Sequence, residues 1–254
     1  MSALWAEEAG DATHPLVVVI HGSMDRSAGM LKLSRQLDEE FRVLRYDRRG
    51  YGRSFPHPGP FAMGAQVDDL VGLLAGRRAV LVGHSYGGNV ALATADHHPE
   101  LVAGVAVYET PLSWEPWWPR TTAGSIAVAE SGNPHDAAER FLRRMLGDHR
   151  WEALPERTRQ GRRAEGVAMV EELADLRRHR PWTAGNIKAP VVVSYGTLGA
   201  AHHNRGMKHA AEVLGCPVVE LANCRHDAPL SHPTLFRTEV IDPLLRAVGP
   251  PWSG

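Results

Sequence analysis

Cysteine is scarce in this sequence. Its 254 residues include only Cys216 and Cys224, and neither belongs to a CxxC pair. A disulfide framework or a zinc knuckle needs more cysteines at closer spacing. We therefore predict two buried free thiols, and neither a disulfide-stapled fold nor a structural zinc site.

Long hydrophobic runs and a basic N-terminal segment are also missing. No stretch of about 18 consecutive apolar residues occurs, which is the length a helix needs to cross a bilayer. Residues 1–10 contain Glu7 and Glu8, and they lack the basic start and the apolar run of a signal peptide. These absences predict a cytoplasmic protein that does not span a membrane.

An excess of charge of either sign is absent as well. Lys and Arg number 28 and Asp and Glu number 29, which gives a formal net charge of −1. A balance of this kind provides no overall field to attract nucleic acid, so we predict no nucleic-acid partner. Basic residues do cluster at 157–163 and 177–180, but the interleaved acids predict a solvated helix face. Those acids are Glu156, Glu165, Glu171, Glu172 and Asp175.

The chain contains short apolar runs rich in β-branched residues. Hydrophobic residues make up 43% of it and charged residues 22%, as in ordinary globular proteins. Runs this uniformly apolar suit strands that are buried on both faces, in a parallel sheet covered by helices. The runs are residues 16–20, 43–46, 79–82, 102–108, 191–195 and 218–221.

Helix-like segments alternate with these runs. Their apolar positions lie three and four residues apart, the spacing of amphipathic helices. The alternation predicts an α/β fold with a mostly parallel, doubly wound sheet, and 254 residues fit one domain of that class. The segments are residues 27–40, 63–74, 89–97, 205–214 and 233–248.

Residues 111–187 interrupt the alternation. They contain no strand-like run, and their first part is rich in tryptophan and proline. Residues 134–146 and 165–178 have the pattern of helices. We predict an α/β core formed by residues 1–110 and 188–254, with residues 111–187 inserted as a helical lid.

Ser85 is the predicted nucleophile. It stands at the centre of the segment GHSYG, residues 83–87, which follows one predicted strand and precedes a helical pattern. Small residues two before and two after a serine let the backbone turn sharply, so that the hydroxyl is exposed at the carboxyl edge of the sheet. The helix that follows presents free N–H groups to developing negative charge.

A serine hydroxyl needs a base, usually a histidine that a carboxylate orients. The turn at Ser85 resembles the nucleophile elbow of α/β-hydrolases, in which the chain order is serine, acid, histidine, and the resemblance implies that the base follows the last strand. His226 lies in a short loop there, whereas His232 precedes Pro233 and is expected to begin the final helix. We predict His226 as the base. The pairs at 97–98 and 202–203 are expected to be surface or structural histidines.

Four motifs in order resemble the α/β-hydrolase family over nearly the whole chain. HG at 21–22 is similar to the oxyanion-loop motif, and DRRGYGRS at 47–54 is similar to the family's D-x-R-G-x-G-x-S segment. GHSYGG at 83–88 resembles the nucleophile elbow, and residues 226–233 resemble the H-x-x-P-x-x-x-P ending. Within the second motif we expect Asp47 to brace a loop and not to react.

The resemblance also implies an oxyanion hole. Its donors would be the backbone N–H groups of Tyr86 and of Ser23, the residue after the HG motif. Met24 would line the same pocket.

The acid is the point at which the sequence departs from the commoner family pattern. Many relatives carry an aspartate shortly after the strand that is 191–195 here, but residues 196–202 read GTLGAAH and contain no carboxylate. Glu109 follows the preceding strand, where some family members carry the acid, and we predict it as the triad acid. Asp227 is the alternative, poorly placed because it adjoins His226. The alternative in which neither carboxylate takes part leaves Glu109 as a brace for the start of the insertion and the site as a dyad of Ser85 and His226.

The predicted reaction is acyl transfer through an acyl-enzyme on Ser85, without a metal or an organic cofactor. Trp114, Trp117 and Trp118 either line an apolar substrate pocket or form the core of the lid. The predicted substrate is a small to medium, largely neutral ester, lactone or thioester.

The same residues leave other functions open. A carbon–carbon bond hydrolase or a cofactor-free perhydrolase would use them too, and a small-molecule receptor can have the same fold. Epoxide hydrolases and haloalkane dehalogenases are disfavoured, because they carry aspartate where Ser85 stands. Oligomeric state is left open.

Overall fold

One sheet organises the molecule, which is described by a computed structural model over residues 4–129 and 132–249. Within these residues the strand order is β1-β3-β2-β4-β5-β6-β7. All neighbouring strands pair in parallel except β1 and β3, which are antiparallel. The strands are β1 Ala6–Ala9, β2 Leu16–Ile20, β3 Arg42–Tyr46, β4 Ala79–His84, β5 Val102–Tyr108, β6 Val191–Gly196 and β7 Val218–Leu221.

The central strands are buried along their whole length. Every residue of β2, β4, β5 and β6 is buried, because helices cover both faces of the sheet. This confirms the predicted α/β class and the parallel, doubly wound sheet. The strand β7 lies at one edge and is partly exposed. Cys216 lies just before it and is only half-buried, contrary to the prediction, whereas Cys224 is buried and both thiols are free.

The sequence pattern did not indicate β1. This edge strand contains Glu7 and Glu8, and three of its four residues are exposed. Its side chains make ion pairs instead of apolar contacts: Glu8 pairs with Arg42 and Arg77, and Glu7 pairs with Arg45 at 3.0 Å. An exposed polar strand of this kind is stabilised by its partner strand, so apolar periodicity does not reveal it.

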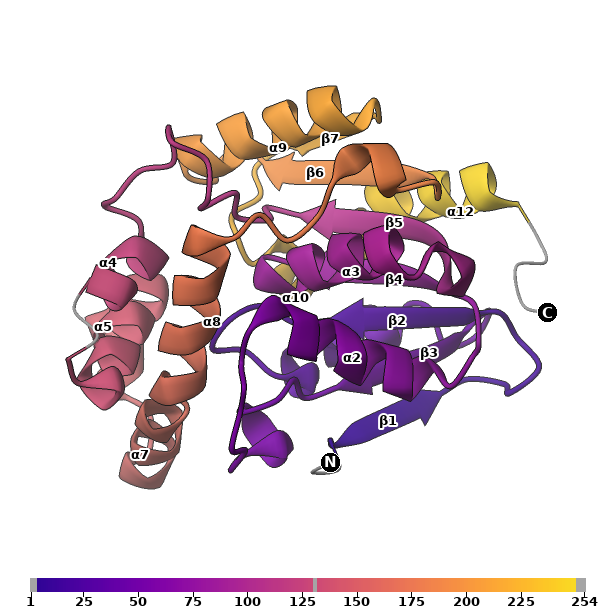
Figure 1. Cartoon of the computed structure of the whole chain (residues 1–254). Coiled ribbons are helices and arrows are strands. Elements are labelled where there is room, and N and C mark those ends of the chain that lie inside the picture. Colours follow the sequence, from indigo (N-terminus) through magenta and orange to yellow (C-terminus); the bar gives the residue numbers. More distant parts are fainter. Residues whose placement is uncertain (1–3, 130–131, 250–254) are drawn as a thin grey trace.

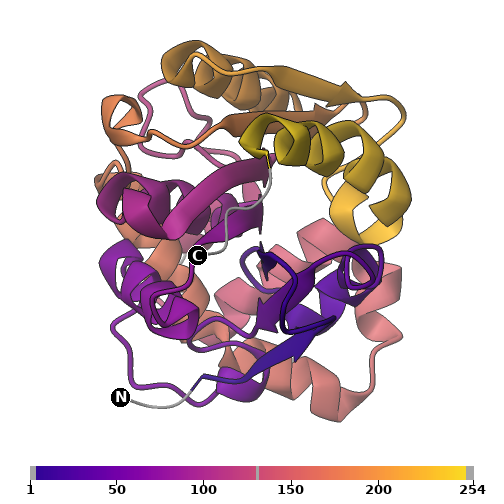
Figure 2. The ribbon, with the colours of Figure 1, turned by 90° about the vertical axis from the view of Figure 1, so that its right-hand side faces the viewer.

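Two layers of helices sandwich the sheet (Figure 1). Figure 2 shows α2 and α3 on one side of the strands and the C-terminal helices, in yellow, on the other. None of the helices in the described residues is long and apolar enough to cross a membrane. On the first side lie α2 Met63–Leu74, α3 Tyr86–His97 and α9 Ala201–Leu214. The other apolar cluster includes residues of η1 Ser27–Met30, α1 Leu31–Ser34, α10 Ala228–Ser231, α11 Pro233–Phe236, η5 Arg237–Ile241 and α12 Asp242–Val248.

Two predicted helices are shorter or interrupted. The segment 27–40 forms a 3-10 turn and one α-helical turn, which bury Met30 and Leu33, followed by hydrogen-bonded turns that bury Leu37. The segment 233–248 contains a π-helical stretch just before Pro243. Proline lacks an N–H group and clashes with the carbonyl four residues earlier, which accounts for an interruption at that place.

The insertion between β5 and β6 is helical, as predicted. The arrowheads of β2 and β6 point toward it in Figure 1, so it lies beyond the carboxyl ends of the parallel strands. Its boundaries as a separate lid stay a prediction, since its residues share apolar clusters with the core. The helices are α4 Ala123–Ala129, α5 Pro134–Leu146, α6 Asp148–Glu152, α7 Glu156–Ala164 and α8 Gly166–Arg178. The insertion also contains the short 3-10 turn η4 Ala184–Asn186, and the core contains η2 Gly52–Ser54 and η3 Pro99–Leu101.

Candidate active site

Ser85 occupies a strained turn between β4 and α3. Its φ is 53° and its ψ is −123°, a backbone conformation that residues other than glycine rarely adopt. Its N–H group donates to Tyr108 O at 2.9 Å, and its carbonyl accepts from Gly88 N–H at 2.9 Å. Strain of this kind persists where the surrounding structure imposes it, and it is concentrated at functional sites.

The glycines around Ser85 are required by close backbone approach. A Cβ atom on Gly83 would lie 2.5 Å from Gly87 O, and one on Gly87 would lie 2.4 Å from Ile20 O. A Cβ atom on Gly88 would lie 1.9 Å from Thr110 Oγ1. A larger residue at any of the three positions would force this turn away from the sheet.

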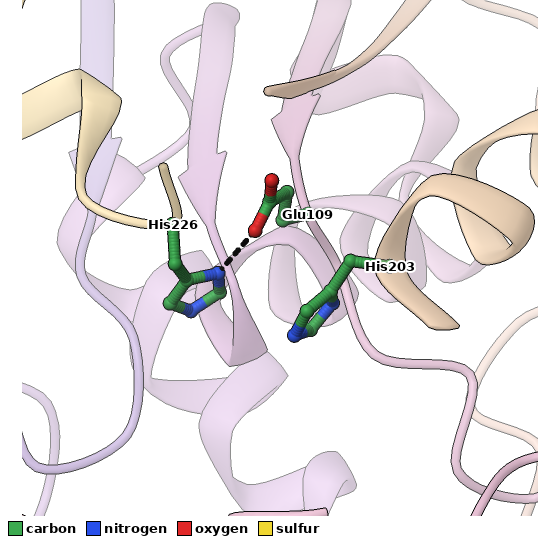
Figure 3. A group of neighbouring side chains, drawn as sticks. All are labelled: Glu109, His203 and His226. Atoms are coloured by element: carbon green, nitrogen blue, oxygen red, sulfur yellow. Dashed lines mark hydrogen bonds and ion pairs between the residues drawn. The ribbon is translucent and has the colours of Figure 1, made fainter. Parts of the chain in front are cut away.

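Glu109 and His226 are hydrogen-bonded to each other. Glu109 Oε2 lies 2.7 Å from His226 Nδ1, as Figure 3 shows. The Glu109 side chain is fully buried, and its other oxygen accepts the Gly196 N–H at 3.0 Å. The Glu109 backbone is itself in the left-handed region, with φ 44°, and its N–H donates to Ser194 O at 3.0 Å. The strands β5 and β6 thus place this carboxylate at the carboxyl ends of the parallel strands.

The loop that carries His226 is tied to β4 and β5. His84 Nε2 lies 2.8 Å from the His226 carbonyl oxygen, and the Tyr108 hydroxyl donates to Arg225 O at 2.6 Å. The rings of His84 and His226 have their centroids 4.8 Å apart. The residue next to Ser85 therefore fixes the loop of the predicted base.

The described residues, 4–129 and 132–249, show no direct hydrogen bond between Ser85 and His226. Such bonds are often long in unliganded hydrolytic sites and tighten when a substrate is bound. The contact through His84 sets the spacing between the two residues.

The segment 21–24 lies beside Ser85. A Cβ atom on Gly22 would come 2.9 Å from Ser85 Cβ. Tyr86 is the first residue of α3, and within the part of the chain that the structure describes neither its N–H nor that of Ser23 donates to another residue. Both N–H groups therefore remain available to a bound oxygen, as an oxyanion hole requires.

Comparison with known proteins identifies the family of the chain. Residues 17–239 match the alpha/beta hydrolase family, which covers most of the chain. The chain belongs to the alpha/beta hydrolase family. The predicted resemblance is thereby confirmed.

This family member is similar over nearly its full length to solved esterase structures. A thermophilic esterase from Thermogutta terrifontis is 25% identical, with a TM-score of 0.74, over 96% of this chain and 93% of that one. An enol-lactonase from Burkholderia xenovorans is 27% identical, with a TM-score of 0.71, over 92% and 94%.

The match to curated relatives is shorter. A 2-(acetamidomethylene)succinate hydrolase from Mesorhizobium japonicum is 33% identical over 98 residues, which are 37% of this chain and 35% of that protein. The chain spans about a third of the length of the first curated relatives that it matches.

Among the described hydrogen bonds of this α/β hydrolase, none joins the remaining sequence candidates to the side chain of Ser85 or His226. Asp227 is exposed, and among the described contacts its side chain makes none to His226. His232 is exposed, begins α11 as expected and lies 2.8 Å from Ser231 Oγ through its Nδ1. Asp47 is buried and accepts hydrogen bonds from Ser27 and Arg53, so it braces a loop as predicted.

His203 is a site residue that the sequence did not indicate. Its ring stacks on that of His226, with centroids 4.8 Å apart and planes 23° apart, and Figure 3 shows the two side chains next to each other. The expectation of a surface or structural histidine at 202–203 therefore misses its contact with the predicted base. The signal available was its position soon after β6, where parallel strands bring side chains to one edge.

The predicted pocket residues have mixed surroundings. Met24 is 2% exposed and packs in the apolar cluster of the insertion, with a φ of 55°. Trp118 is 4% exposed and lies edge-on to His203 at 5.6 Å, so it reaches the site through that ring. Trp114 lies edge-on to Trp182 at 5.6 Å, and Trp117 packs against His209 at 5.7 Å. Contact of these residues with substrate stays a prediction.

Glu109, His203 and His226 also form a possible set of metal ligands. One donor atom from each lies within 4.8 Å of the others. A carboxylate and two imidazoles suit a transition-metal ion. The hydrogen bond between Glu109 and His226 is equally the geometry of a proton-transfer pair, and the sequence predicts no metal here.

Two acids expected on a solvated helix face are buried instead. Glu172 is 0% exposed and Glu165 is 3% exposed. Glu172 receives Arg48 Nη1 at 2.6 Å, and Glu165 receives Arg26 Nη2 at 2.7 Å. Charge spacing indicates one exposed face, but it does not reveal that Glu172 of α8 and Glu165 just before it pair with arginines of the core, of which Arg48 is fully buried and Arg26 partly exposed.

Three histidines near the site are kept neutral by burial. Desolvation, with His226 nearby, lowers the pKa of His84 to about 3. Desolvation and the adjacent Arg48 hold the pKa of His21 well below its usual value. Desolvation followed by the neighbouring His226 does the same for the pKa of His203.

Acid should therefore destabilise the fold. In the unfolded chain a histidine binds a proton below about pH 6.5, whereas folded His84 stays neutral down to about pH 3. The unfolded state binds more protons between these values, so stability falls as the pH falls. Each such histidine should lower the free energy of unfolding by about 1.4 kcal/mol per pH unit in that window.

Urea unfolding between about pH 7 and about pH 4.5 measures this slope. The control is His84→Gln, whose amide can still donate to the His226 carbonyl. Its slope should be smaller by about 1.4 kcal/mol per pH unit. Equal slopes in the two proteins would mean that His84 is protonated in the fold.

Proposed function

We propose that this protein is a serine hydrolase that cleaves a small to medium, largely neutral carboxylic ester, lactone or thioester. Ser85 is the nucleophile, His226 the general base and Glu109 the orienting acid. The observation that carries the proposal is the 2.7 Å hydrogen bond between buried Glu109 and His226, beside the strained turn at Ser85.

The hydrogen bond assigns the tautomer of His226. Its Nδ1–H donates to Glu109, which leaves Nε2 free to accept the Ser85 proton as Ser85 Oγ attacks the carbonyl carbon. The carbonyl oxygen becomes an oxyanion, and the N–H groups of Tyr86 and Ser23 receive it. His226 then gives the proton to the leaving group, and an acyl-enzyme remains on Ser85.

Water completes the cycle by the same path. His226 accepts a proton from the water as it attacks the acyl carbon, and the second tetrahedral intermediate releases the acid and restores the Ser85 hydroxyl. Each step uses side chains and backbone groups of this chain only.

Two comparisons support the substrate class. Of the solved structures to which the chain is similar, one is named an esterase and one an enol-lactonase. The apolar surroundings of Met24 and Trp118 favour a substrate without strong charge near these residues.

Labelling with a fluorophosphonate tests the nucleophile. We expect the probe to modify Ser85, which mass spectrometry of the digested protein would locate, and His226→Ala to be labelled at least about 10²-fold more slowly. A folded wild-type sample with no label on Ser85 would refute every hydrolase function for this site.

A panel of p-nitrophenyl esters of increasing acyl length separates the remaining functions. A hydrolase turns over repeatedly, with a preferred acyl length set by the pocket. A receptor on this fold would release at most about one equivalent of nitrophenol. A carbon–carbon bond hydrolase would turn over a vinylogous diketone faster than any ester. A perhydrolase would turn over a carboxylic acid with hydrogen peroxide faster than any ester.

A further inference from the structure

Glu172 of the insertion is at the centre of a buried network. One of its oxygens, Oε1, accepts both the Ser23 hydroxyl and the Tyr51 hydroxyl, each at 2.6 Å. The other, Oε2, receives Arg48 Nη1 at 2.6 Å. Glu172 and Arg48 are both fully buried, so their charges are screened little by solvent.

Arg48 extends the network to the start of the oxyanion segment. Its Nε–H donates to His21 O at 3.0 Å, and its backbone N–H donates to His21 Nε2 at 2.9 Å. The other ring nitrogen, His21 Nδ1, lies 2.7 Å from Gly22 O and so donates to it. The guanidinium also lies over the ring of Tyr86, 4.7 Å from its centroid.

Every residue of the segment 21–23 is therefore held by the Arg48–Glu172 pair, directly or through one neighbour. The direct link from the insertion to Ser23 is the hydroxyl that binds Glu172. Fixed donors stabilise a developing oxyanion without reorganisation during the reaction, and a displacement of about 1 Å in such a site costs about 10²-fold in rate.

We infer that Glu172 is a positioning residue that acts through Ser23, so that docking of α8 on the core sets the geometry of the oxyanion hole. This inference rests on the proposed function. It adds that the insertion takes part in the chemical step as well as covering the site, although Glu172 itself touches no substrate.

Two matched variants test the inference. Ser23→Ala and Tyr51→Phe each delete one hydroxyl that donates to the same oxygen of Glu172, and each keeps its backbone N–H. We expect Ser23→Ala to lower kcat on a p-nitrophenyl ester about tenfold with KM within about twofold, and Tyr51→Phe to keep kcat within about twofold. A purely structural Glu172 would make the two variants alike.

Glu172→Gln provides the larger effect. It keeps an oxygen for Ser23 but removes the charge that holds Arg48, and we expect kcat to fall about 10²-fold, with an equal fall in the rate of labelling by a fluorophosphonate. The control on the same helix is Asp175→Asn, whose carboxylate accepts the Met63 N–H at 2.8 Å, lies 2.8 Å from His179 Nδ1 and makes no hydrogen bond to residues 21–23 among the described residues. Its kcat should stay within about twofold of wild type.

The outcomes are separable. If wild-type Ser85 is not labelled, the proposed function fails. If it is labelled and Ser23→Ala matches Tyr51→Phe, or Glu172→Gln keeps kcat within about threefold of wild type, the positioning role alone fails. If Glu172→Gln does not fold, the pair at positions 23 and 51 decides the question.

Discussion

Replacing Ser85 with alanine should lower the turnover of an ester about 10⁶-fold, to the level that substrate binding and the oxyanion donors alone sustain. Alanine keeps the Cβ atom and so meets the same strained turn, which leaves the fold in place while removing the attacking oxygen. Steady-state hydrolysis of the best p-nitrophenyl ester measures the loss, with the thermal unfolding midpoint as the check on folding.

The control for this loss is Ser231→Ala. Ser231 is exposed, and its hydroxyl binds Asp227 O and His232 within its own short helix. Its turnover should stay within about twofold of wild type. Ser85→Ala protein that retains more than about 1% of wild-type turnover, after contamination is excluded, would assign the nucleophile to another residue.

Replacing Glu109 with glutamine should lower kcat about 10³–10⁴-fold. The glutamine oxygen can still accept the Gly196 N–H, which directs its NH₂ group toward His226 Nδ1. That contact favours the imidazole tautomer that carries its proton on Nε2. In this tautomer Nε2 has no lone pair, and so it cannot accept the Ser85 proton. Measurement of kcat and KM on one ester, with KM expected to change little, isolates the loss in the chemical step.

Asp227→Asn is the matched control, because Asp227 is the other carboxylate near His226 in the sequence. Its side chain is exposed, and we expect kcat within a factor of about three. Turnover of Glu109→Gln within a few-fold of wild type would reduce the triad to a dyad of Ser85 and His226, with Glu109 bracing the start of the insertion.

The sequence predicts most of the sheet because strands that are buried on both faces consist of short, continuous apolar runs. The strands at 16–20, 102–108 and 218–221 are predicted with the bounds observed, and those at 79–82 and 191–195 extend only one or two residues further. Helix ends are predicted less well. Apolar spacing continues through turns in the segment 27–40, where the backbone is no longer helical.

The pairing of Glu109 with His226 could also be predicted from the sequence, because it depends on where the strands end. Parallel strands end at one edge of a sheet, so the residue after β5 and a loop after β7 come together there although 117 positions separate them. The contact itself comes from the turn at Glu109 and the hydrogen bond from Gly196 N–H, neither of which has a local sequence pattern.

The sequence by itself determined the alternation of buried strands and helices in the core and the turn at Ser85, because each depends on neighbours in the chain. Only the tertiary structure decided the surroundings of Glu172 and His203. Both lie on helices whose local pattern resembles an exposed face, and each makes its decisive contact with a residue far along the chain. Long-range pairing between buried polar groups has no local period, and so it becomes visible only when the insertion is docked on the core.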